Sequence, residues 1–119
     1  MPAQYERAPE YSRVSTTLDT SVGATDQTLK TSAGLLLGFD AANTHATEWV
    51  YLKLYDASSV TVSSATPTYT FALPPASVQR VELEWPRKFL TAIHYACAQE
   101  RAAGATAPTT APSIEFRYV

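Results

Sequence analysis

The sequence predicts an all-β protein: a jelly-roll-like β-sandwich of seven or eight short antiparallel strands that follows an N-terminal extended arm. Three observations support this fold class. Helical periodicity is almost absent, apolar residues alternate with polar ones in short runs, and proline, glycine, asparagine or aspartate separates these runs. Threonine and serine together occupy 26 of the 119 positions. Short strands at this spacing are typical of two sheets that bury their alternate residues against each other.

The early strands are predicted at three places. A weak strand is expected near residues 12–18. Residues 34–39 form a continuous apolar run ended by turn residues at 40–44, which is typical of a central strand buried on both faces. Residues 48–55 show the clearest alternation, because every second residue is a large aliphatic one that would face the core. The opposite face of this strand carries Trp49, Tyr51, Lys53 and Tyr55.

Prolines mark the ends of two later strands. After a weak strand at residues 59–62, residues 68–73 alternate until Pro74-Pro75, which lacks amide donors for a sheet ladder. Residues 78–85 alternate again, and Pro86 is expected to end this strand. Its predicted inward residues are Val81, Leu83 and Trp85.

Two further strands and a division of the chain complete the predicted fold. Residues 90–98 and 114–118 alternate in the same way, and a loop of small residues at 100–112 separates them. We expect residues 33–119 to form the sandwich domain and residues 1–32 to form the N-terminal arm and the first weak strand. An arm loses conformational entropy only when it docks, so it often belongs to a partner's surface.

The sequence contains no convincing catalytic, metal or cofactor site. His45 and His94 lie in no motif that would place two metal ligands on one face, and both are expected to be structural. Glu82 and Glu84 would share one strand face, whereas glycosidases need carboxylates that face each other across a cleft. Cys97 has no neighbouring lysine or arginine in sequence to lower its pKa, which favours an inert buried thiol. We therefore expect no enzyme.

Composition also restricts the partners. Nine Lys and Arg against eleven Asp and Glu give a net charge of -2, which provides no electrostatic attraction to nucleic acid. The longest apolar run is far shorter than a membrane span, and the first residues resemble no secretion signal. We expect no nucleic acid and no membrane partner, and synthesis in the cytoplasm. The outward aromatics Trp49, Tyr51 and Tyr55 would suit a protein interface, with sugar stacking as the alternative.

A series of short motifs in residues 34–119 gives the only indication of a family. In order they are GLLLGFDAANTHATEWVYLKLYDA, TPTYTFALPP, VELEWP, KFLTAIHYACAQE, APTTAPS and IEFRYV. This order resembles a group of small virion proteins of tailed phages, which share an apolar strand ending near an asparagine, a Lys-Leu-Tyr-Asp ending, an ALP turn and a TAPS before the last strand. That group tends to have glycine in loops where this chain has Pro75, Ala76 and Arg87, and the N-terminal third has no counterpart.

The resemblance implies a β-sandwich subunit on the exterior of a phage capsid, a decoration or cement protein made in the host cytoplasm. Its implied partners are the major capsid protein and further copies of itself in a homotrimer. The expected arm contacts to the shell are Tyr5, Arg7, Tyr11 and Arg13, and the expected contacts between subunits are Trp49, Tyr51 and Tyr55. Two alternatives stay open: a tail, baseplate or head-to-tail component, and a carbohydrate-binding module for host adsorption.

Overall fold

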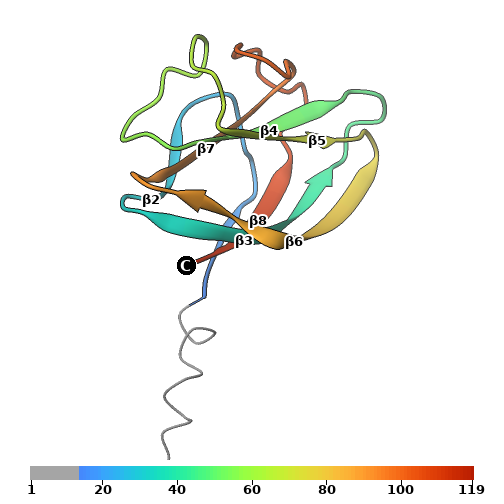
Figure 1. Ribbon diagram of the computed structural model, residues 1–119. Coiled ribbons are helices and arrows are strands. Elements are labelled where there is room, and N and C mark those ends of the chain that lie inside the picture. Colours follow the sequence, from blue (N-terminus) through green and yellow to red (C-terminus); the bar gives the residue numbers. More distant parts are fainter. Residues whose placement is uncertain (1–13) are drawn as a thin grey trace, which may run out of the picture.

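The computed structural model describes residues 14–119, which form eight β-strands and no helix (Figure 1). Nothing within these residues is a helix suited to crossing a membrane. In chain order, the strands are β1 (Ser15–Asp19), β2 (Gln27–Lys30), β3 (Gly34–Asn43), β4 (Val50–Tyr55), β5 (Tyr69–Leu73), β6 (Ser77–Phe89), β7 (Ile93–Ala98) and β8 (Ser113–Tyr118).

The strands form two antiparallel sheets of four that pack face to face. Sheet A has the order β1-β8-β3-β6, and sheet B has the order β2-β7-β4-β5. Strand β1 pairs with β8, β2 with β7, β3 with β6 and β4 with β5. This nested pairing is what results when one long antiparallel ribbon is rolled up, and it is the arrangement of a jelly roll. The predicted fold class is therefore confirmed.

The core lies between the sheets and follows the two-residue period of the strands. Sheet A contributes Phe39 and Phe116, and sheet B contributes Leu52 and Leu54, all with no exposed surface. Large rings cross the gap between the sheets: the Tyr95 and Phe116 centroids are 4.5 Å apart. Strand β7 is buried along its whole length. The predicted inward face of β4 is confirmed, and the predicted alternation of β7 and β8 is also found, because one side of each strand joins this core.

Strand β6 is longer than the sequence predicted. Pro86 does not end it, because the strand continues to Phe89. The register with β3 shifts so that residues 83–86 lie opposite the single residue Leu37, and the missing amide of Pro86 falls in this bulge on an edge strand. The bulge also changes which side chains point inward. Trp85 was predicted to be buried and is instead 74% exposed.

Other strand predictions need correction. Strand β3 extends to Asn43 rather than ending at residue 39, and only one of its faces is buried. Residues 59–62 form no strand; they belong to a loop that packs on sheet B through Val62. The short strand β2, which was not predicted, pairs with β7. Both β1 and β2 are thus parts of the two sheets, although they lie before residue 33.

Candidate functional site

The outer face of sheet B is covered by the chain's own loops. Figure 1 shows the connections β4–β5 and β7–β8 lying on the side of sheet B that faces away from sheet A. Under the first loop, Tyr55 and Val62 pack together with 2% and 5% of their surfaces exposed. The predicted outward direction of Tyr51, Lys53 and Tyr55 is correct, but this face is not open to a partner.

Lys53 shows how tightly the second loop is held. Its side chain has no exposed surface, and Nζ donates hydrogen bonds to the carbonyl oxygens of Ala102 and, at 3.1 Å, Gly104. Burial lowers the pKa of Lys53, an effect that the nearby Glu100 carboxylate opposes. The ammonium therefore serves to hold the loop, because its hydrogen bonds go to that loop's backbone.

His94 and Asp26 form a second fixed contact on the same face. His94 Nδ1 lies 2.6 Å from Asp26 Oδ1, and only 5% of His94 is exposed. The other oxygen of Asp26 accepts a hydrogen bond from the Val60 amide at 3.2 Å, which ties the first loop to the sheet. His45 Nδ1 accepts hydrogen bonds from the amides of Thr47 and Glu48. Each histidine thus organises local structure, in agreement with the sequence prediction.

The outer face of sheet A, in contrast, carries no covering loop within residues 14–119 (Figure 1). The strand register places its outward side chains in rows across the sheet. One row, from β1 to β6, is Leu18, Glu115, Asp40 and Arg80; the row beside it contains Arg117, Gly38 and Glu82. This open face is the candidate interaction surface of the molecule.

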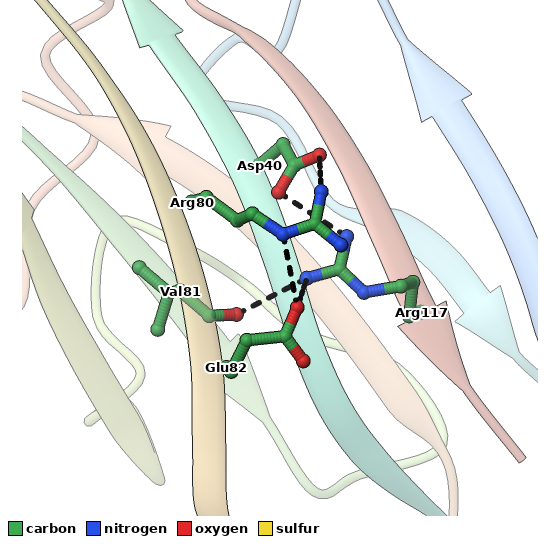
Figure 2. A network of polar contacts seen from close by, with 5 residues as sticks. All are labelled: Asp40, Arg80, Val81, Glu82 and Arg117. Carbon is green, nitrogen blue, oxygen red and sulfur yellow. Dashed lines mark hydrogen bonds and ion pairs between the residues drawn. The ribbon is translucent and has the colours of Figure 1, made fainter.

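Ion pairs hold the centre of this surface in one arrangement (Figure 2). Arg117 extends from β8 across β3, with Nη2 3.1 Å from Glu82 Oε2 and 3.2 Å from the Val81 carbonyl oxygen, to which it donates a hydrogen bond. Its Nη1 lies 3.2 Å from Asp40 Oδ1, an ion-pair distance outside hydrogen-bonding geometry. Arg80 also contacts Asp40 and Glu82, at 3.3 and 3.2 Å. Two arginines and two acids therefore balance one another.

Gly38 makes this crossing possible. A Cβ at this position would lie 2.4 Å from the Val81 carbonyl oxygen and 2.9 Å from Arg117 Nη2. Any side chain would therefore block the path of the arginine over β3. The absence of a side chain brings β3 and β6 close together and leaves room for the guanidinium.

A shallow hollow lies beside the ion pairs, towards the far end of β1. It has a volume of about 230 Å³. Small residues on β3 and β8 make its floor, and the exposed Leu18 and Val78 project beside it from the two edge strands. The residues that line it are Leu18, Asp40, Ala41, Ala42, Val78, Ser113 and Glu115.

The site residues predicted from sequence are not brought together. Tyr5, Arg7, Tyr11 and Arg13 lie outside the residues that the structure describes. Trp49 is 50% exposed just before β4, whereas Tyr51 is partly covered, with the Arg101 guanidinium 5.3 Å from its ring centre. Tyr55 is buried under its own loop. Of the three aromatics expected at a subunit interface, Trp49 is the one that remains well exposed.

The remaining reactive side chains show no site in the described part of the chain. Cys97 is a free thiol in the core, and burial raises its pKa, which agrees with the expected inert thiol. Residues 14–119 hold no group of three histidine, cysteine, aspartate or glutamate side chains placed to bind a metal ion. Comparisons with protein-family models, with curated proteins and with solved structures found no match to this chain.

Sequence reasoning missed the open face of sheet A. Its outward residues are visible as the alternation Ser113, Glu115 and Arg117, and as Asp40 and Ala42 in the segment that was expected to be a turn after the apolar run. What the pattern lacks is any sign of which sheet face the loops cover. That depends on contacts between residues far apart in the chain.

Proposed function

We propose that this protein acts by surface contact, as a structural subunit that binds another protein through the outer face of sheet A. The observation that carries this proposal is the contrast between the two outer faces. One is covered by two loops, and the other carries no covering loop within residues 14–119 and has exposed Leu18 and Val78 around a hollow and ion pairs at its centre. Exposed apolar side chains beside preorganised polar groups are typical of protein interfaces.

In its specific form, the protein is a capsid decoration protein on the exterior of a tailed-phage virion. The resemblance of residues 34–119 to small virion proteins supports this assignment. The jelly roll supports it by analogy, since viral capsid and lectin domains share this fold, and fold alone does not specify function. On a repeating shell, many weak contacts act together, so a small interface suffices for each subunit. The partners are then the major capsid protein and further copies of the chain in a homotrimer.

Copy number and position in the particle test this function. Quantitative mass spectrometry and electron cryomicroscopy of the phage that encodes the chain should find many copies on the outside of the head. A few copies in the tail, baseplate or neck would instead support the alternative structural role. Absence from the particle would overturn both. Light scattering of the purified chain tests the homotrimer, since a monomer at working concentration would contradict it.

The arm contacts are tested on the same particles. Deletion of residues 1–13 should lower occupancy of the shell if Tyr5, Arg7, Tyr11 and Arg13 bind it, and unchanged occupancy would refute these contacts. For the carbohydrate-binding alternative, Trp49 is the one well-exposed ring of the three, since Tyr55 is buried and Tyr51 lies against Arg101. Binding of the chain to a glycan array would support this alternative if the Trp49→Ala variant lost that binding.

A further inference from the structure

The hollow on the outer face of sheet A contains an acidic side chain, Glu115, that forms no ion pair with any of residues 14–119. Glu115 lies on β8 directly between Leu18 of β1 and Asp40 of β3. Like charges directly opposite one another on a sheet face are destabilising, so positive charge near Glu115 and Asp40 would stabilise the pair. Asp40 forms ion pairs with two arginines, whereas no ion pair within residues 14–119 involves Glu115.

Arg117 is near Glu115 in the sequence, but its guanidinium pairs with Asp40 and Glu82 instead. Arg117 is two residues from Glu115 on the same face of β8, so the two side chains start as neighbours. The guanidinium nevertheless extends to Val81 and Glu82 on β6 (Figure 2), and a Cβ on Gly38 would lie 2.9 Å from its Nη2. Arg80, on the far side of Asp40, is occupied by Asp40 and Glu82. Both arginines that pair on this face are therefore engaged by Asp40 and Glu82 and not by Glu115.

The apolar surroundings of Glu115 determine which cation fits. Leu18 and Val78 are 58% and 80% exposed, and both line the hollow together with Glu115. A long side chain can lay its methylenes against such residues while its charged end reaches a carboxylate. A guanidinium suits this place better than an ammonium, because it is more weakly hydrated and bonds a carboxylate with two parallel N–H groups.

We propose that the hollow receives an arginine side chain from the protein that binds this face. The guanidinium pairs with the Glu115 carboxylate, and the methylenes lie against Leu18 and Val78. This inference rests on the proposed function in one respect, since it takes the outer face of sheet A as the binding face. It adds the chemistry of the partner: an arginine that projects from its surface.

Nuclear magnetic resonance with a small probe tests the site without the partner. N-acetyl-arginine methylamide is titrated into the ¹⁵N-labelled full-length chain, and the amides of Leu18, Ala42, Ser113 and Glu115 should shift together with a dissociation constant on the order of millimolar. The Glu115→Gln variant should bind about tenfold more weakly, because it loses a charge-assisted pair. Glu84→Gln removes one exposed carboxylate elsewhere on β6 and is the matched control.

Three results would overturn the proposal: no shifts at the hollow, equal binding of the neutral citrulline analogue, or equal binding of the lysine analogue. Dependence of the same shifts on protein concentration without probe would assign the hollow to a second copy of the chain, which also contradicts it. The arginine contact and the proposed function can be refuted independently. If Glu115→Gln and Glu84→Gln decorate particles equally, the arginine contact is wrong while the location in the virion stands. If the chain is absent from particles, the proposed function is wrong, and arginine binding can still be measured.

Discussion

Gly38 is the residue on which the ion pairs of sheet A depend. An added Cβ would overlap the Val81 carbonyl oxygen and Arg117, and the first of these is backbone that cannot move alone. We expect Gly38→Ala to lower the free energy of unfolding by about 1–3 kcal/mol, as overpacking does. Denaturant unfolding measures this. Gly23→Ala is the control, because a Cβ there meets nothing within 4 Å, and an equal loss in both variants would refute the explanation.

Asp56 provides a pH-dependent contact at the end of β4. Its carboxylate accepts hydrogen bonds from the amides of Leu90 and Thr91 at 2.8 and 2.7 Å, and these lower its pKa. Because the folded pKa lies below the unfolded value of about 4, the stabilisation is complete above that pH and is lost as pH falls through the folded pKa. Asp56→Asn should therefore be less stable than wild type at pH 7.

The difference in the free energy of unfolding between wild type and Asp56→Asn should become smaller as the pH approaches 3. Urea unfolding at several pH values between 7 and 3 measures it, with Glu84→Gln as a carboxylate control. If the difference in the free energy of unfolding stayed constant over this range, Asp56 would not act through its charge.

At the scale of elements, Lys53 joins β4 to the loop that follows β7. We expect Lys53→Met to free residues 99–108 while the sheets persist, because methionine fills the same space without donating to Ala102 and Gly104. Hydrogen exchange at the Gln99 and Thr106 amides, which are hydrogen-bonded within this loop, should accelerate about tenfold. The exposed Lys88→Met is the matched control. Unchanged exchange in Lys53→Met would contradict this role.

A strand could be predicted from the sequence where apolar and polar residues alternate along it and the folded strand keeps that alternation. In strands β4, β7 and β8 every second residue joins the core, so the alternation in the sequence located these strands. Strand β6 breaks the period at its bulge, which no local pattern announces, and Trp85 is consequently exposed. Strand β2 is four residues long with a single buried residue, too little for a pattern. The loop cover of sheet B and the open face of sheet A arise from long-range packing, so the candidate surface could not be predicted.

For the whole molecule, residues 14–30 link the two sheets. Strand β1 pairs with β8 in sheet A, and β2 pairs with β7 in sheet B. Between them, Val22 is fully buried and donates its amide hydrogen to the Pro112 carbonyl oxygen, and the Gly23 carbonyl accepts one from Cys97. The Tyr95 hydroxyl donates to Asp19 Oδ2 at 2.8 Å across the interior. This segment therefore closes one side of the sandwich.

Deletion of residues 1–30 should abolish cooperative folding, because it removes an edge strand from each sheet and exposes β7 and β8. Deletion of residues 1–13 should leave the unfolding transition in place, since every contact just described lies within residues 14–119. Thermal unfolding followed by circular dichroism and tryptophan fluorescence distinguishes the two. If the chain without residues 1–30 still unfolded in one sharp transition, residues 33–119 would form a complete domain as the sequence first predicted. Loss of folding would instead place β1 and β2 among the elements without which the jelly roll does not close.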